Sequence, residues 1–313
     1  MNVSMFAGVE LGGTKCVCIL ASEPDAIVDR VVIATTTPDY TLGAIEAVLS
    51  RWRAGHAIAG LGVASFGPVE LDPRSQYFGF ITTTSKPNWS GTDVARRLAR
   101  AADAPMVIDT DVNGAALAEQ CWGAATGLDD LAYVTVGTGV GVGLIVNGQR
   151  VHRHGHPELG HVRIARVVGD TWPGACPYHG DCVEGLASGH AISARLGGRK
   201  LGSLGPDDSL WDGVAWALAQ LCHTITCATA PRVILFGGGV LMGQSHLLAR
   251  VQAMLRISLA GYLALPDDYL QPAGLGELAG PLGAIALGMQ AVPASANAQS
   301  WALPNFGCAD NFY

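Results

Sequence analysis

The first half of the chain alternates between short β-type runs and amphipathic helical segments. Two β-rich runs, Phe6–Glu10 and Cys16–Leu20, flank a turn-forming segment at 11–15 and predict a hairpin. Thr41–Ala54 has apolar residues at helical spacing. The other elements predicted in this half are strands at Val31–Thr36, Ile58–Ala64 and Met106–Ile108, and helices at Asp93–Ala102 and Val112–Ala124.

The pattern starts again after Gly127. Ala132–Val136 and Gly143–Val146 read as strands around a second glycine-rich turn, and Asn147-Gly148 is typical of a tight turn that leads into a strand at Arg150–His152. A loop rich in cysteine and histidine follows. The elements predicted after it are helices near Ser188–Leu196 and Leu210–Ala230, a strand at Val233–Phe236 and a last helix at Leu282–Gln290.

A strand–hairpin–strand unit followed by strands and helices therefore occurs twice. This repetition predicts an α/β protein of two similar halves with a cleft between them. We expect an N-terminal domain at residues 1–114, joined by a C-terminal helix at about 282–291. A second domain at 115–281 would carry the cysteine–histidine loop, and residues 292–313 would form a tail without clear periodicity.

Composition and charge narrow the class of protein. A chain of 313 residues with 49% hydrophobic residues can bury two cores. The formal net charge of −7 gives no sign of the basic surface that nucleic-acid binding requires. We find neither a signal peptide nor an apolar run of membrane-spanning length. The eight cysteines lack the spacing that is typical of a disulfide-stabilised domain, which indicates a reduced, cytoplasmic protein.

The first glycine turn, Leu11-Gly12-Gly13-Thr14-Lys15, has features of a phosphate loop. Gly12 and Gly13 let backbone N–H groups approach phosphate oxygens closely, Thr14 adds a hydroxyl donor and Lys15 a point charge. The segment is not the common nucleotide-binding P-loop, and no helix follows it. The alternative is a plain hairpin turn.

The second half contains an equivalent turn, Gly137-Thr138-Gly139-Val140-Gly141. A dinucleotide-binding fold would need a helix after these glycines, whereas a strand follows here. Two matching hairpins, one in each half, could grip a polyphosphate from both sides of the cleft. Gly237-Gly238-Gly239 ends a strand, and it either caps that strand or leaves room for adenine.

The loop after residue 152 offers a metal site. Cys176, His179 and Cys182 supply two thiolates and an imidazole within seven residues, a set that suits tetrahedral Zn²⁺. His161 is our choice for the fourth ligand, which would make the metal structural. The three other histidines nearby, His152, His154 and His156, are read as lining a solvated loop. The alternative is a pair of unligated loop cysteines.

Together these segments resemble the ROK family of sugar kinases and repressors, and within it the zinc-containing bacterial fructokinases. The resemblance covers nearly the whole chain apart from the tail. The matching segments are Gly8–Lys15, Gly62–Asp72, Gly79–Pro87, Asp109–Gly127, Thr135–Gly148, His156–His161, Cys176–Gly189 and Val233–Val240. Two departures from the general family pattern, Glu10 in place of aspartate and His179 in place of cysteine, agree with the fructokinase branch or with a Cys₂His₂ zinc site.

The resemblance implies a two-domain sugar-kinase/actin-like (ribonuclease H-like) fold with ATP, Mg²⁺ and a hexose in an interdomain cleft. It gives Asp111 the role of general base; from the residues alone, a helix N-cap is an equal alternative. It implies sugar contacts from Glu158, His161 and Glu184, although the two glutamates could be surface loop charges. Expected further contacts come from Gly67, Thr110 and Asn113, where Asn113 could instead hold the start of the helix. Gly67 and the loop Thr84–Trp89 are expected to close the other wall of the pocket, where Trp89 would either stack on the sugar or pack under the loop.

The function implied is ATP-dependent phosphorylation of fructose to fructose 6-phosphate by a homodimer. Another hexose kinase, for glucose, mannose or an N-acetylhexosamine, is the nearest alternative, because one hydroxyl or methylene changes selectivity by only about 1–3 kcal/mol. The family also contains repressors with a winged helix ahead of the kinase-like body. Only seven residues precede the first hairpin segment here, so we expect no such domain. A non-catalytic sugar-binding regulator is the third alternative.

Overall fold

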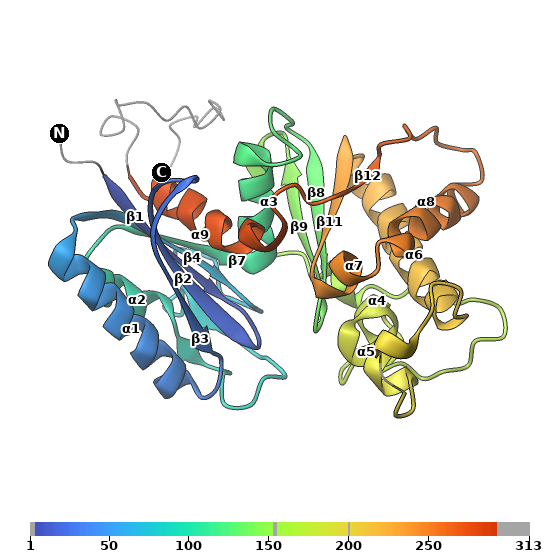
Figure 1. The fold of residues 1–313 in the computed structure, drawn as a ribbon, viewed down its shortest axis with the longest axis horizontal. Helices are drawn as coiled ribbons and strands as arrows, with labels where there is room; N and C mark the ends of the chain where they lie inside the picture. Colours follow the sequence, from blue (N-terminus) through green and yellow to red (C-terminus); the bar gives the residue numbers. More distant parts are fainter. Residues whose placement is uncertain (1–3, 153–154, 200, 293–313) are drawn as a thin grey trace.

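The structure is a computed structural model that describes residues 4–152, 155–199 and 201–292 (Figure 1). The predicted tail at 292–313 lies, apart from its first residue, outside the described residues. The elements of the first half are β1 (Met5–Leu11), β2 (Lys15–Glu23), β3 (Ala26–Ala34), α1 (Pro38–Gly55), β4 (Ile58–Ser65), β5 (Phe80–Ile81), β6 (Thr92–Asp93), α2 (Ala95–Ala102), β7 (Met106–Thr110) and α3 (Asp111–Trp122). Those of the second half are β8 (Leu131–Val136), β9 (Val140–Val146), β10 (Gln149–Arg150), α4 (Val183–Ala187), α5 (Gly189–Arg195), α6 (Leu210–Thr229), β11 (Val233–Gly237), α7 (Gly239–Gly243), α8 (His246–Leu259), β12 (Leu270–Pro272) and α9 (Ala279–Gln290).

The two large sheets have the same topology. Their strand orders are β3–β2–β1–β4–β7 and β10–β9–β8–β11–β12. In each, the first three strands form an antiparallel meander and the next two add in parallel, β4 and β7 in one sheet and β11 and β12 in the other. The repeated strand–hairpin unit read from the sequence is therefore confirmed, including the hairpin turns at 12–14 and 137–139.

The helices form layers on and between these sheets (Figure 1). α1 and α2 cover the outer face of the first sheet, and α6 and α8 cover the outer face of the second. α1 buries Leu42, Ile45, Leu49 and Trp52, which share one helical face. α3 and α9 lie in the middle of the molecule, between the two sheets. Each sheet thus has a core on its outer side, and the two halves share the central helix pair.

Glycines allow α3 and α9 to pack almost backbone to backbone. A Cβ atom added to Gly283 of α9 would overlap the carbonyl group of Gly114 in α3. On the other side of α9, a Cβ added to Gly62 of β4 would overlap the carbonyl oxygen of Ala284. Because no side chain separates these backbones, α9 fits into a space that larger residues would close.

Glu119 ties α3 to the segment that leads into α9. Glu119 is an interior residue of α3, and its side chain is fully buried. The carboxylate accepts hydrogen bonds from the backbone N–H groups of Ala124 at 2.8 Å, Gly274 at 3.0 Å and Leu275 at 2.9 Å. A buried carboxylate needs such partners, since an unpaired one is strongly destabilising. The bonds from Gly274 and Leu275 join residues about 155 positions apart in the sequence.

Six of the described helices and strands were not predicted, namely β5, β6, α4, α7, α8 and β12, and several boundaries differ from the prediction. α8 buries Leu247, Val251, Leu255 and Leu259, a four-residue spacing that was present in the sequence. α7 and β12 are short, and β12 is a strand because it pairs in parallel with β11. The strand predicted at 31–36 begins earlier, because β3 pairs along most of β2. Within the described residues, no helix combines the length and apolar character needed to cross a membrane.

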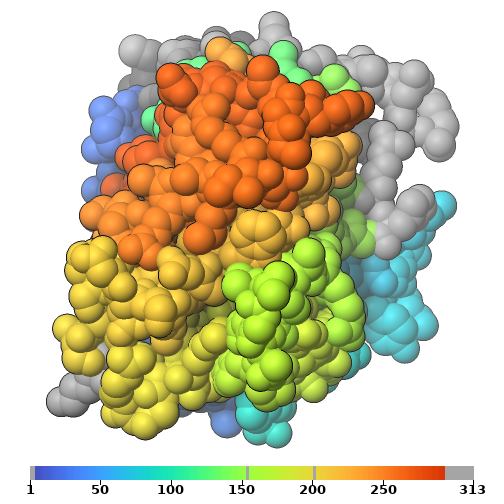
Figure 2. All heavy atoms as spheres, turned by 90° about the vertical axis from the view of Figure 1, so that its right-hand side faces the viewer, coloured from blue at the N-terminus to red at the C-terminus, as the bar shows by residue number. Residues whose placement is uncertain are grey.

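The loop that carries the predicted zinc ligands is held by ion pairs. Figure 2 shows this part of the chain, in yellow-green, on the outer surface of the second half, beside the yellow and golden segments that include α5 and α6. Asp181 pairs with Arg166 at 2.9 Å, and Asp170 forms a two-bond pair with Arg195 of α5 at 2.9 and 3.0 Å. The first pair therefore joins two parts of the loop to one another, and the second fixes the loop to the helical layer.

The packing of α9 predicts an asymmetry between two glycine-to-alanine changes. Gly62→Ala should lower the free energy of unfolding by about 3 kcal/mol or more, because the added methyl group meets backbone rather than a movable side chain. Gly43→Ala, in the interior of α1 with open space around it, should instead raise it by about 0.5–1 kcal/mol. Denaturant unfolding of both variants measures this, and equal effects would contradict the packing described for α9.

Candidate active site

A cavity of about 1010 Å³ lies between the two halves. Both glycine hairpins reach it, the first through Gly13 and the second through residues 137–142. The other predicted site residues that line it are Gly67, Thr110, Asp111, Glu158, His161, Cys176, His179 and Glu184. The structure thus brings together residues that are more than 170 positions apart in the sequence.

Asp111 lies at the first position of α3, where β7 ends. Thr110 is the N-cap of the helix, because its hydroxyl oxygen accepts a hydrogen bond from the backbone N–H of Asn113 at 3.2 Å. The N-cap alternative for Asp111 is therefore wrong. One oxygen of Asp111 accepts the N–H of Val112 at 2.9 Å, and burial raises the pKa of this carboxyl group to about 6.

Two further acidic groups near Asp111 have higher pKa values. Burial raises the pKa of Glu158 to about 7, and the carboxylates of Asp111 and Glu184 add to the rise. Burial, followed by the charge of Asp111, likewise raises the pKa of Glu10 to about 7. Asp111 therefore ionises first as the pH rises. A site in which neighbouring carboxyl groups have separated pKa values can assign them different proton-transfer roles.

The predicted sugar contact Asn113 does not line the cavity. It is 1% exposed, its amide nitrogen donates to Asp109 at 2.9 Å, and its oxygen accepts the backbone N–H of Leu144 at 3.3 Å. Asp109 is also fully buried and accepts a hydrogen bond from Arg150 of β10 at 2.8 Å. These bonds fix the start of α3 against the second sheet. The sequence offered the helix-start alternative for Asn113, but it gave no sign of the Asp109–Arg150 pair.

His156 lines the same wall of the cavity as Gly67 and Glu158. Its side chain is 6% exposed, so the interpretation of this histidine as part of a solvated loop is wrong. Nε2 accepts the backbone N–H of Val69 at 3.1 Å, and Nδ1 lies 3.3 Å from Glu158. Burial lowers the pKa of His156, as an accepting ring nitrogen requires. A neutral histidine of the second half thereby contacts the backbone of the first.

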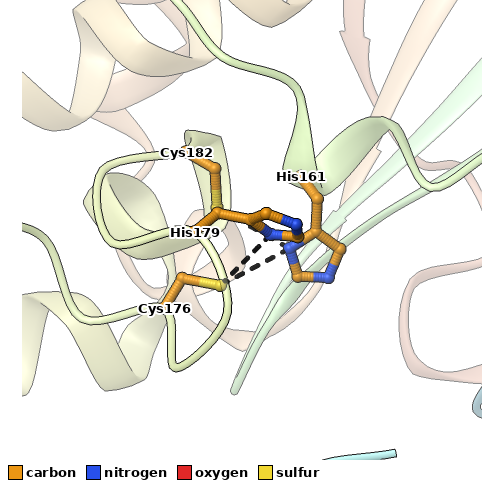
Figure 3. A group of neighbouring side chains, drawn as sticks. All are labelled: His161, Cys176, His179 and Cys182. Atoms are coloured by element: carbon orange, nitrogen blue, oxygen red, sulfur yellow. Dashed lines mark hydrogen bonds between the residues drawn. The ribbon is translucent and has the colours of Figure 1, made fainter. Parts of the chain in front are cut away.

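The four predicted metal ligands converge, as Figure 3 shows. Nδ1 of His161 lies 3.6 Å from the sulfur atoms of both Cys176 and Cys182, and Nδ1 of His179 lies 3.7 Å from Cys176. Tetrahedral zinc with bonds of about 2.3 Å to sulfur and 2.05 Å to nitrogen places such ligand atoms about 3.6 Å apart. The donor set and its spacing therefore fit Zn²⁺.

The two ring nitrogens of His161 lie near different groups. Nδ1 points to the cysteine sulfurs, while Nε2 lies 3.9 Å from Glu184 in the wall of the cavity. Glu184 in turn accepts the backbone N–H of Val140 in the second hairpin at 3.1 Å. The metal-ligand cluster, the candidate sugar pocket and the second glycine hairpin are consequently one connected unit.

Several predicted nucleotide contacts lie outside the cavity wall. These residues are Gly12, Thr14, Lys15, Gly237, Gly238 and Gly239. Gly238 has a φ of +88° and packs against the backbone of Val136, next to the second hairpin. The loop at 84–89 does form part of the wall, through Thr84, Ser85 and Lys86; Lys86 was not singled out as a site residue from the sequence. Trp89 is fully buried and donates its indole N–H to Thr36 at 2.8 Å, so it packs under its loop.

Comparisons with known proteins agree with this arrangement. The profile of the ROK family matches residues 6–291. A fructokinase of Pediococcus pentosaceus is 38% identical over 291 residues, which are 92% of this chain and 99% of that protein. A fructokinase of Zymomonas mobilis subsp. mobilis is 39% identical over 294 residues, covering 92% of this chain and 97% of that protein.

The crystal structure of a ROK hexokinase from Thermus thermophilus is also similar, with a TM-score of 0.73 and 26% identity over 91% of this chain and 98% of that one. The predicted sugar-kinase/actin-like fold is thereby confirmed, as is the resemblance read from the motifs. The chain belongs to the ROK family.

Proposed function

We propose that this protein transfers the terminal phosphoryl group of ATP to a hexose, namely fructose, to give fructose 6-phosphate. The observation that carries this proposal is the carboxylate of Asp111, which lies in a cavity bordered by both glycine hairpins and is not used as a helix cap. Fructokinases align with this chain over most of its length, which supports fructose as the acceptor.

The chemistry assigned to each residue follows from its position. Asp111 takes the proton of the attacking sugar hydroxyl, and Glu158, Glu184 and His161 accept or donate hydrogen bonds to the other hydroxyls. The backbone of Gly137–Gly139 faces the phosphates of ATP. Gly67 lets the ring of His156 pack close to the wall of the cavity, because a Cβ atom there would crowd that ring.

Mg²⁺ is proposed to accompany ATP, where it would neutralise charge on the β- and γ-phosphates. Glu10 is the residue that the family resemblance connects with this ion. Its carboxyl group lies near the end of β1, close enough to Asp111 for the charge of Asp111 to raise its pKa. A carboxyl group whose pKa is raised by burial gains stability in its ionised form when a cation is beside it.

Zn²⁺ is proposed to occupy the Cys₂His₂ cluster as a structural ion. All four ligand positions would be filled by side chains, which leaves no position for water. The ion would fix the ring of His161 through Nδ1 and leave Nε2 to face the pocket. A homodimer and a cytoplasmic location, both expected from the sequence, are proposed as well.

A hexose panel tests the proposed function. With Mg²⁺-ATP and a coupled assay of ADP release, kcat/KM for fructose should exceed that for glucose, mannose and N-acetylglucosamine by about tenfold or more, as one or two well-placed hydroxyl contacts provide. Preference for another hexose would retain the kinase assignment and refute fructose. Absence of turnover on all of them by folded, metal-replete protein would refute the kinase assignment.

Replacing the proposed base tests its role. Asp111→Asn should lower kcat by about 10²–10⁴-fold, the usual contribution of a positioned base. In the wild type, kcat/KM should fall as the pH decreases through about 6, because protonation of Asp111 removes the base. Asp103→Asn, a change at an exposed carboxylate of the same half, should leave turnover within about twofold. Retention of near-wild-type turnover by Asp111→Asn would refute the role.

The stability of Asp111→Asn shows whether its loss of turnover is a folding defect. A carboxyl group whose folded pKa is raised destabilises the folded state once the pH exceeds its unfolded pKa of about 4. Between about pH 4 and pH 6, the contribution of Asp111 to stability therefore falls as the pH rises. Asparagine carries no such penalty, so at pH 7–8 the variant should melt at an equal or slightly higher temperature.

The metal cluster gives a further prediction. Purified protein should contain about one zinc per chain, and Cys176→Ser should lower zinc retention against a chelator by about tenfold or more. Because His161 would lose its fixed orientation, KM for the sugar should rise as well. Cys227→Ser, which changes an exposed thiol of α6, is the matched control. Full sugar affinity in zinc-free protein would contradict the proposed link.

A further inference from the structure

The cavity presents an electrostatic problem for a polyphosphate substrate. Three carboxyl groups line it, those of Asp111, Glu158 and Glu184. Of the residues that the structure describes, Lys86 is the only lysine or arginine in its wall. ATP brings several negative charges into this space, and their repulsion by the carboxylates must be offset by cations or by N–H donors.

Lys86 is held at the tip of the first glycine hairpin. It belongs to the loop between β5 and β6, and its Nζ donates to the carbonyl oxygen of Gly13 at 2.6 Å and to that of Thr35 at 3.4 Å. Gly13 itself lines the cavity, and there is open space where its side chain would be. An ammonium group has three donors, so these two carbonyls leave one for another acceptor.

The loop that carries Lys86 is firmly anchored. Trp89 is fully buried beneath it, donates to Thr36 and meets the ring of Phe66 edge-on at 5.2 Å. The backbone N–H of Lys86 donates to the hydroxyl of Thr84 at 3.3 Å. The ammonium group is thus placed by a packed loop, which reduces the entropy lost when it binds an anion.

Lys15 does not take this position. It follows the hairpin at the start of β2, its side chain is exposed, and it is not part of the cavity wall. Its charge acts on Glu10, where it opposes the rise in the pKa of that carboxyl group. The sequence pattern of glycines followed by lysine therefore predicts a cation at the hairpin, but the structure supplies a different one from another loop.

We propose that Lys86 binds the terminal phosphate of ATP and stabilises it during transfer, an inference that rests on the proposed kinase function. In that step the bond between the γ-phosphorus and the β–γ bridging oxygen breaks, and a bond from the γ-phosphorus to the sugar oxygen forms. The proton of the sugar hydroxyl passes to Asp111, and ADP leaves. Lys86 keeps its protons throughout and acts only as a positive hydrogen-bond donor.

The test compares nucleotides with and without the distal phosphates. In Lys86→Met, affinity for the ATP analogue AMPPNP with Mg²⁺ should fall about tenfold or more, the loss expected for one charge-assisted contact, whereas affinity for AMP should stay within about twofold. kcat should fall about 100-fold, with KM for fructose little changed. Lys86→Arg, which keeps the charge, should restore part of both losses. Calorimetry and steady-state kinetics measure these values.

Two comparisons make the assignment refutable. Arg53→Met removes one charge from an exposed part of α1 in the same half and should change none of these values appreciably. Equal losses for AMP and AMPPNP in Lys86→Met, together with a lower melting temperature, would show that Lys86 only supports its loop. Selective loss of AMPPNP binding in Lys15→Met but not in Lys86→Met would assign the cation to Lys15 and overturn the proposal.

These titrations contain no sugar, so their outcome is separate from that of the hexose panel. If the wild type phosphorylates no hexose, the proposed function fails, but the AMP and AMPPNP affinities still decide whether Lys86 contacts a distal phosphate. If the wild type is a fructokinase and Lys86→Met retains AMPPNP affinity and kcat, only the assignment of Lys86 fails.

Discussion

The close contact between the backbones of α3 and α9 determines the geometry of the whole molecule. Both helices lie between the sheets, and they approach one another at Gly114 and Gly283 without intervening side chains. The carboxylate of Glu119 adds two hydrogen bonds from α3 to the segment that leads into α9, and a third to the turn that follows α3. Since α3 begins at Asp111, the position of that carboxylate in the cavity depends on how α3 is seated against its neighbours.

The start of α3 is fixed by a second set of contacts, and these reach into the other half. Asp109 and Asn113 connect β7 and α3 to β9 and β10 through Leu144 and Arg150. Arg150 also donates to Gln290, the last residue of α9. A charge pair that is buried this deeply stabilises only if its geometry is maintained. Any relative movement of the halves must therefore keep this point fixed or break a costly interaction.

The sequence predicted those features that depend on neighbouring residues. Both hairpins, the amphipathic α1 and α6 and the convergence of Cys176, His179 and Cys182 follow from local spacing. The role of Thr110 as helix cap and the contacts of His156 and Lys86 did not follow. Each of the latter two contacts joins a side chain to backbone from a distant segment, Val69 for His156 and Gly13 for Lys86. A backbone acceptor or donor leaves no trace in residue type, so no pattern could indicate these pairs.

The charges of the cavity explain why its lysine, Lys86, is held against the first glycine hairpin and not against Asp111. The pKa of Asp111 is raised by burial and opposed only by backbone hydrogen bonds; neither Lys15 nor Lys86 contributes to it. A lysine in contact with Asp111 would lower this pKa and make the carboxylate a weaker base. Carbonyl groups of Gly13 and Thr35 instead hold the ammonium group of Lys86 on the first hairpin. Bound phosphate would then be attracted at one end of the cavity while its own negative charge raises the pKa of Asp111, so substrate binding favours the proton transfer that the reaction requires.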